Sequence, residues 1–292
     1  METTQNQAPT IKNGFVRALF YLITGFIVCG IVQLVYANSI DKGAYTEISD
    51  IKNISQILLS YFIIKIGLVV CAILFMLFVN REPLVNLGFT WKNHSKDAVA
   101  GFIIGIAIIT VGTIILLFSN NIYLSDVEFD SSDILFSTLL CVVVAFIEEI
   151  SIRGYVLRNL MQGMNKWWAL GLSSLVFAML HLDNADITII ALTNIFIAGI
   201  LLGVNYVYTK NLWFSIFLHF SWNFFQGTIF GYEVSGIPTG KSVFTNAVKG
   251  SDILSGGNFG FEGSIVCTIL QVIVIAGLVW YYKLRYKESI PK

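Results

Sequence analysis

The chain has 292 residues, of which 56% are hydrophobic and 12% are charged, and its mean hydropathy is +0.76. Globular domains carry about a quarter charged residues, so this composition excludes an ordinary water-soluble domain and indicates a membrane protein. The 18 basic and 18 acidic residues cancel, which leaves no electrostatic argument for a nucleic-acid partner.

Apolar stretches recur along the chain, each close to or above the roughly 17–25 residues that cross a bilayer as a helix. The sequence therefore predicts an all-α, polytopic membrane helix bundle of about eight transmembrane helices, with the lipid bilayer as its first partner. In chain order the predicted spans are residues 15–37, 57–79, 98–118, 134–157, 167–182, 187–208, 212–230 and 264–282.

Basic residues gather in every second connection, and acidic residues in the others. The positive-inside rule then places both termini in the cytoplasm of a multi-pass cell-membrane protein. Lys42, Lys52, Lys241 and Lys249 weaken the bias without reversing it. The basic connections hold Lys12 and Arg17, then Arg81, Lys92 and Lys96, then Arg158 and Lys166, then Lys210, then Lys283, Arg285 and Lys287.

The first span could instead be a signal peptide, because Val35–Ala37 has small residues where a signal peptidase reads. Its apolar region is long for a signal peptide, so an uncleaved span is favoured. The cysteines, Cys29, Cys71, Cys141 and Cys267, fall within predicted spans without paired spacing. They predict neither a disulfide framework nor a thiolate metal site.

The segments outside the spans indicate how the chain is organised. Residues 1–13 are polar and predict a disordered cytoplasmic tail, residues 14–133 hold the N-terminal transmembrane helices, and residues 264–292 hold the last helix and a basic tail. The segment 231–263 contains eight glycines, too many for a regular helix, and too few apolar residues for a core. We expect residues 232–263 to be a long outward loop.

Charged residues stand inside the fourth span, in the stretch "AFIEEISIRGYVL". An ionisable side chain within a span costs about 2.5–3.5 kcal/mol on insertion scales and usually marks a functional site. Glu149 and Arg153 are four residues apart and can form an ion pair on one helix face. Glu148 lies about 100° around the helix and is free for other chemistry. That the two acids simply neutralise arginines near a helix end remains open, more so for Glu149.

Two further pairs at helical spacing carry polar groups into later spans: Phe177 with His181, and His219 with Asn223. Either pair alone is equally consistent with hydrogen-bonded core. Two of the three histidines in the chain nevertheless fall in spans, at depths compatible with Glu148. One carboxylate and two imidazoles can hold a metal with an open water position, or an acid can activate water directly. Both readings predict hydrolysis.

With these residues in view, the sequence resembles the intramembrane type 2 CAAX-prenyl-protease family, also called the CPBP, bacteriocin-processing or Abi-like family. Its motifs EExxxR, FxxxH and HxxxN or HxxxD stand here in order. The resemblance covers roughly residues 137–231 and implies a catalytic core over 134–231, with a cavity opening inside the membrane. One departure is Ile152, where family members commonly carry an aromatic.

The resemblance implies a role for each motif residue. Glu148 would activate water with help from His181, and His219 and Asn223 would complete the site by donating to the oxyanion. Glu149, Arg153 and Phe177 would support that arrangement. The family is described as metalloproteases, which implies a divalent metal such as zinc at Glu148, His181 and His219, while a purely glutamate-dependent scheme uses the same residues.

Three functions stay open on the sequence alone. The first is an intramembrane endopeptidase acting on a peptide or membrane protein. The second is an immunity or scaffolding membrane protein that keeps the fold without proteolysis, and the third is a proton-coupled transporter. The transporter is the weakest, because it would not require three ordered motifs and no inverted repeat is evident. The sequence does not identify the substrate.

Overall fold

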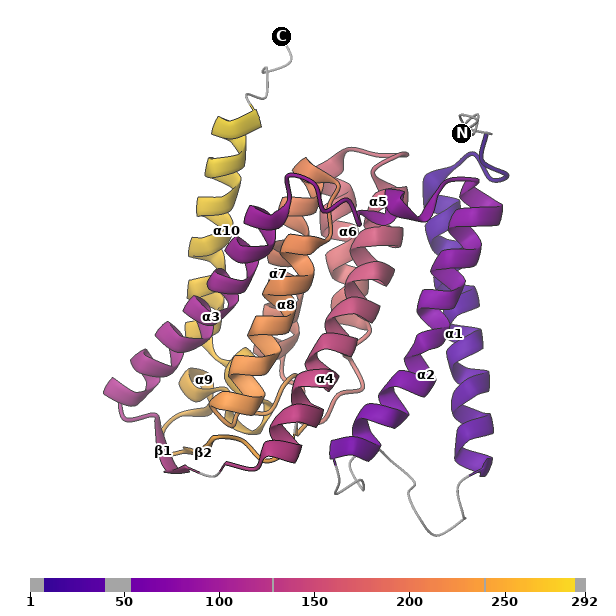
Figure 1. The fold of residues 1–292 in the computed structure, drawn as a ribbon. Coiled ribbons are helices and arrows are strands. Elements are labelled where there is room, and N and C mark those ends of the chain that lie inside the picture. Colours follow the sequence, from indigo (N-terminus) through magenta and orange to yellow (C-terminus); the bar gives the residue numbers. More distant parts are fainter. Residues whose placement is uncertain (1–7, 40–53, 128, 239, 287–292) are drawn as a thin grey trace.

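The computed structural model describes residues 8–39, 54–127, 129–238 and 240–286. Over these ranges the chain is a helical bundle with one small antiparallel sheet at one end (Figure 1). The all-α, polytopic membrane bundle is confirmed. The α-helices are α1 (Gly14–Ser39), α2 (Ile54–Leu74), α3 (Ser95–Phe118), α4 (Ser131–Glu149), α5 (Arg158–Leu160), α6 (Lys166–Met179), α7 (Ile189–Thr209), α8 (Trp213–Asn223), α9 (Asp252–Ser255) and α10 (Ile265–Tyr286).

Shorter elements extend or join these helices. The strands are β1 (Ile122–Val127) and β2 (Phe244–Val248). Three π-helical segments continue α2, α4 and α8 directly: η2 (Phe75–Asn80), η4 (Ile150–Leu157) and η5 (Phe224–Ile229). The 3₁₀ turns are η3 (Leu84–Leu87), η6 (Gly257–Phe259) and η7 (Phe261–Gly263).

Each of the eight predicted spans contains a helix, but not all of them are long. Among the described residues, six helices are long and apolar enough to cross a membrane. The exceptions are α6, with 14 residues, and α8, with 11 residues before it continues as η5. The predicted span 167–182 overran the end of α6, because the Asp and Asn residues that follow His181 favour turns over helix.

Both ends of the described chain lie at one end of the bundle, and β1, β2 and α9 lie at the other (Figure 1). We call these the terminal side and the loop side. Residues 1–7 of the predicted disordered tail lie outside the described residues. Residues 8–13 are ordered, contrary to that prediction: the Thr10 amide donates to the Val79 carbonyl at 2.8 Å, and the Arg17 Nη1 donates to the Ile11 carbonyl at 2.6 Å.

Helix α8 is held closely against α3 by two glycines four residues apart. A Cβ at Gly101 would stand 2.2 Å from the Phe214 carbonyl oxygen, and one at Gly105 would stand 2.1 Å from Ser221 Oγ. Small residues at this spacing let two membrane helices approach until their backbones touch. The contact fixes the position of α8, which carries His219 and Asn223.

Helix α2 meets α4 through a small apolar cluster on the loop side. Ile54 and Ile57 are buried there together with Leu140, and Leu58, Tyr61, Phe136 and Val144 pack around them. In Figure 1 α1 and α2 form a pair at one edge of the bundle, with α2 next to α4. The cluster fixes the position of α2, which lines a cavity between the helices.

The glycine-rich segment after α8 does not form a loop without a core, contrary to expectation. It contains β2, which pairs antiparallel with β1, and two aromatic side chains that are fully buried, Phe259 and Phe261. The glycines permit this tight folding: Gly260 has φ +87°, and a Cβ there would stand 2.3 Å from the Glu233 carbonyl oxygen. The expected long outward loop is therefore a folded segment with its own buried aromatic side chains.

Candidate active site

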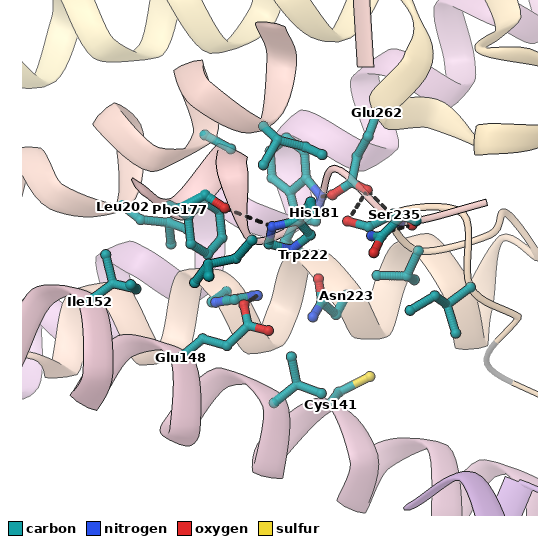
Figure 2. A pocket seen from close by; sticks show the side chains of 18 of the residues that line it. Cys141, Glu148, Ile152, Phe177, His181, Leu202, Trp222, Asn223, Ser235 and Glu262 are labelled. Atoms are coloured by element: carbon teal, nitrogen blue, oxygen red, sulfur yellow. Dashed lines mark hydrogen bonds and ion pairs between the residues drawn. The ribbon is translucent and has the colours of Figure 1, made fainter. Parts of the chain in front are cut away.

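A cavity of about 270 Å³ lies among α2, α4, α7, α8 and the turn after α6. Its walls are mostly apolar, with a limited set of polar groups, which is typical of a ligand site. Figure 2 shows Glu148, His181 and Asn223 pointing into it from different elements. The polar and ionisable residues that line it are Tyr61, Lys65, Cys141, Glu148, Ser151, His181, Asn184, His219, Asn223, Ser235 and Glu262.

The two acids of α4 point in different directions, as the helix geometry predicts. Glu148 lines the cavity and keeps 20% of its side chain exposed, whereas the side chain of Glu149 is fully buried. The chain changes from α- to π-winding immediately after Glu149, at Ile150. Isolated π turns within α-helices are frequent at functional sites.

The predicted ion pair between Glu149 and Arg153 is present. Arg153 Nη1 lies 2.8 Å from Glu149 Oε1, and both side chains are buried. Arg153 Nη2 also donates to the Gly199 carbonyl at 3.0 Å, and the guanidinium stands 4.5 Å from the centre of the Phe177 ring. This charge is therefore satisfied on several sides, and it connects α4 to α6 and α7.

Glu149 has a second partner that the sequence did not reveal. His219 Nδ1 lies 2.9 Å from the same oxygen, Glu149 Oε1. Because the carboxylate is an acceptor, the Nδ1–H of His219 donates to it, which leaves Nε2 as the functional nitrogen. His219 Nε2 faces Glu148 Oε2 at 3.9 Å. It can donate a hydrogen bond there only when the ring is protonated.

Glu148 is held by a tyrosine from another helix. The Tyr61 hydroxyl of α2 donates to Glu148 Oε1 at 2.7 Å. The two carboxylate oxygens therefore have different surroundings: Oε1 faces a phenol and Oε2 faces the imidazole of His219.

His181 lies in the turn just after α6, not in the helix itself. Its Nδ1 donates to the Phe177 carbonyl at 2.8 Å, so its Nε2 carries the lone pair. The Phe177 ring lies 4.8 Å from the His181 ring and 6.3 Å from the His219 ring, measured between centres. Phe177 therefore packs near both imidazole rings.

Asn223 follows His219 by one helical turn at the end of α8 and is 5% exposed. Its amide faces the cavity (Figure 2). As at Glu149, the helix changes to π-winding directly after it, at Phe224. Helices α4 and α8 therefore share this change of winding.

The loop side of the cavity is closed by a buried acid of the glycine-rich segment. Glu262 Oε1 accepts from Trp222 Nε1 at 2.9 Å, and Glu262 Oε2 accepts from the amide and hydroxyl of Ser235 at 2.6 and 2.8 Å. Ser235 and Glu262 appear together at the rim in Figure 2. This contact fastens the segment after α8 onto the helix that carries His219.

The structure brings all four predicted catalytic residues, Glu148, His181, His219 and Asn223, to one cavity. Sequence reasoning missed Tyr61, Lys65 and Glu262. A signal existed for one of them, because Lys65 is the only Lys, Arg, Asp or Glu in the predicted span 57–79. The rule that drew attention to Glu148 applies equally to that lysine.

The metal prediction gains no support from the arrangement of the donor groups. Within residues 8–39, 54–127, 129–238 and 240–286, no three His, Cys, Asp or Glu side chains are grouped closely enough to hold a metal ion. The orientations of His181 and His219, each with Nδ1 donating to an oxygen, suit a metal ligand but equally suit a base or a donor. Zinc at Glu148, His181 and His219 stays a prediction.

Comparison with known proteins bears on the same segment. Residues 130–225, about a third of the chain, match the family model described as Type II CAAX prenyl endopeptidase Rce1-like. The match contains every residue of the three motifs and excludes α2 and the glycine-rich segment. No curated protein matches the chain.

Proposed function

We propose that this chain is an endopeptidase that uses water activated by Glu148. The starting point is residues 130–225, which match the Rce1-like family model and indicate a CPBP-type intramembrane protease domain. The match of residues 130–225 to that family model supports a CAAX-type membrane protease. The mechanism and the substrate are our proposal. The observation that carries it is the Glu148 carboxylate, partly exposed in an apolar cavity beside two histidines of fixed orientation.

The first half of the reaction forms a tetrahedral intermediate. Water lies between Glu148 and His181 Nε2, and Glu148 takes one of its protons as general base. The oxygen then bonds to the carbonyl carbon of the peptide, and the carbonyl oxygen becomes an oxyanion. His181 accepts a hydrogen bond from the attacking water, because its Nδ1–H is engaged with the Phe177 carbonyl.

The second half breaks the peptide bond. Asn223 and protonated His219 donate to the oxyanion, and donors held ready for that charge are worth several kcal/mol in a site of low dielectric. Glu149 stabilises the protonated ring through His219 Nδ1. When the intermediate collapses, the C–N bond breaks and Glu148 returns its proton to the leaving nitrogen, so an acid and an amine are released.

The substrate is a peptide or a membrane protein whose scissile segment reaches the cavity among the helices. We further propose that the chain lies in the cell membrane with its terminal side in the cytoplasm, since the connections at that side are rich in Lys and Arg. The proposed orientation is independent of the chemistry at Glu148.

The test is cleavage by purified protein in detergent. The probes are a farnesylated CAAX peptide and a pool of unmodified decapeptides of random sequence, with new termini read by mass spectrometry. We expect the parent to cut at least one probe and Glu148→Gln to cut none while melting like the parent. His181→Ala should behave like Glu148→Gln, and Phe177→Leu should be milder.

Cleavage by Glu148→Gln at the parental rate would overturn the general-base assignment. If neither probe is cut, and cells that carry Glu148→Gln behave like cells that carry the parent protein, the non-proteolytic immunity or scaffolding function would be favoured over proteolysis.

A further inference from the structure

Helix α2 contributes one face to the cavity although it lies outside the Rce1-like segment 130–225. The lining residues of α2 are Ile57, Tyr61, Lys65 and Leu68. They recur every three or four residues, so they form one stripe along the helix. The site described by the three motifs is therefore incomplete without a residue stripe from the N-terminal part of the chain.

Tyr61 is the member of that stripe that touches Glu148. Its hydroxyl lies 2.7 Å from Glu148 Oε1, while Glu148 Oε2 stands 3.9 Å from His219 Nε2. The terminal torsion of a glutamate is broad, so a carboxylate without a partner samples many orientations. A hydrogen bond to an ionised acceptor is short and strong, particularly where water is scarce.

We propose that Tyr61 is a positioning residue of the active site, one that fixes which oxygen of Glu148 acts on water. The hydroxyl occupies Oε1, so Oε2, directed at His219, is the oxygen that takes the proton. Tyr61 keeps its own proton throughout the cycle. This inference rests on the proposed function of Glu148.

The alternative is that Tyr61 only joins α2 to α4. The apolar cluster already does this, because Ile54 and Ile57 are buried against Leu140. The Tyr61 ring packs with that cluster, but its hydroxyl is directed at Glu148. Removing the hydroxyl alone should therefore leave the helix contact intact and change the chemistry.

The chain offers a matched control for this substitution. The hydroxyls of Tyr36 in α1 and Ser60 in α2 form a hydrogen bond of 2.9 Å. Ser60 directly precedes Tyr61, and neither Tyr36 nor Ser60 lines the cavity. Tyr36→Phe thus removes a phenol hydroxyl bonded to the same helix without touching Glu148. The comparison separates loss of a tyrosine hydroxyl in general from loss of the one at the site.

The experiment measures kcat, KM and thermal unfolding for the parent, Tyr61→Phe and Tyr36→Phe, using the peptide of the random pool or the farnesylated CAAX peptide that the parent cuts fastest. For Tyr61→Phe we expect kcat to fall about 10–100-fold, the usual cost of losing a group that orients an active-site ligand. KM should stay within about twofold, because Tyr61→Phe keeps the ring that lines the cavity and removes only the hydroxyl bonded to Glu148. Tyr36→Phe should match the parent.

A Tyr61→Phe enzyme with kcat within twofold of the parent would overturn the inference, and so would a rise in KM with kcat unchanged. Should Tyr61→Phe not fold, Tyr61→His supplies a second test, since a ring donor should keep more activity than Tyr61→Leu. Glu148→Gln is measured alongside. An inactive Glu148→Gln with a normal Tyr61→Phe refutes only this inference, whereas an active Glu148→Gln refutes the proposed function itself.

Discussion

Glu149 and His219 are joined by a hydrogen bond of 2.9 Å, although 70 positions separate them in the sequence. The accepting oxygen, Oε1, is the one that also pairs with Arg153. The second glutamate of the EExxxR motif therefore does more than neutralise an arginine. It connects the buried cation to an imidazole that faces the cavity.

This relationship makes Glu149→Gln a change with two separable effects. Arg153 is 1% exposed, and an uncompensated buried charge costs about 3–5 kcal/mol, so the variant should unfold at a lower temperature. Adding Arg153→Met should recover most of the stability. Activity should stay at least about tenfold low, because a neutral amide does not stabilise protonated His219. Thermal unfolding and peptide cleavage in detergent provide both readouts.

The control for that comparison is Glu82→Gln. Glu82 pairs with Arg158, but 23% and 13% of the two side chains are exposed, so water replaces much of the lost contact. We expect a smaller loss of stability than for Glu149→Gln. Equal losses in the two variants, or full activity in Glu149→Gln with Arg153→Met, would contradict the linked roles of Glu149.

The close contact between α3 and α8 predicts sensitivity at Gly105. The Cβ of Gly105→Ala would stand 2.1 Å from Ser221 Oγ and 2.8 Å from the Leu218 carbonyl oxygen, so α8 must shift. We expect a loss of about 1–3 kcal/mol, as for other overpacked sites, together with reduced cleavage as His219 moves. Gly277→Ala is the matched control, because a Cβ there meets nothing within 4 Å. An unchanged Gly105→Ala would show that the two helices are not in close contact.

Chelation tests whether a metal takes part. The proposed mechanism activates water with the Glu148 carboxylate alone, so it predicts that 1,10-phenanthroline or EDTA leaves the cleavage rate within about twofold. Metal content of the purified protein is measured in parallel. Loss of activity that zinc restores, with stoichiometric zinc in the untreated protein, would establish the metal site at Glu148, His181 and His219 instead.

The proposed orientation predicts a labelling pattern. Lys92 precedes α3 on the terminal side, Lys249 follows β2 on the loop side, and both are exposed. In a Cys29→Ala background, Lys249→Cys should react with an impermeant maleimide in intact cells. Lys92→Cys should react only after permeabilisation. The reverse pattern would invert the topology.

Helix content was predictable from the sequence because length and hydropathy determine which segments can cross a bilayer. The three motifs also identified residues that the fold brings to one cavity, since spacing of four residues within a helix is a local property. The partner of Glu148 was not predictable. Tyr61 lies 87 positions away, and its contact depends on how α2 and α4 are rotated and tilted against each other.

Two connecting segments differ from their predicted structure. Glycine content distinguishes helix from non-helix, but it does not distinguish an open loop from one that folds back to bury Phe259 and Phe261. The turn that carries His181 was likewise assigned to a helix, because apolar residues continue to Leu182. For the glycine-rich segment the missing information was tertiary, whereas Asp183 and Asn184 are a local turn signal that marks the end of the helix before His181.

The change of winding after Glu149 and after Asn223 has a consequence for how the length of this gene can vary. A π turn closes its hydrogen bonds five residues apart instead of four, so it accommodates one more residue than an α turn. Removing one codon within Ile150–Leu157 or Phe224–Ile229 would restore α-winding and keep the flanking residues on their faces. Removing one codon before Glu148 or His219 would instead rotate those side chains by about 100° relative to the preceding residues. Within α4–η4 and α8–η5, single-residue length differences between this chain and its relatives should therefore occur in the π segments η4 and η5.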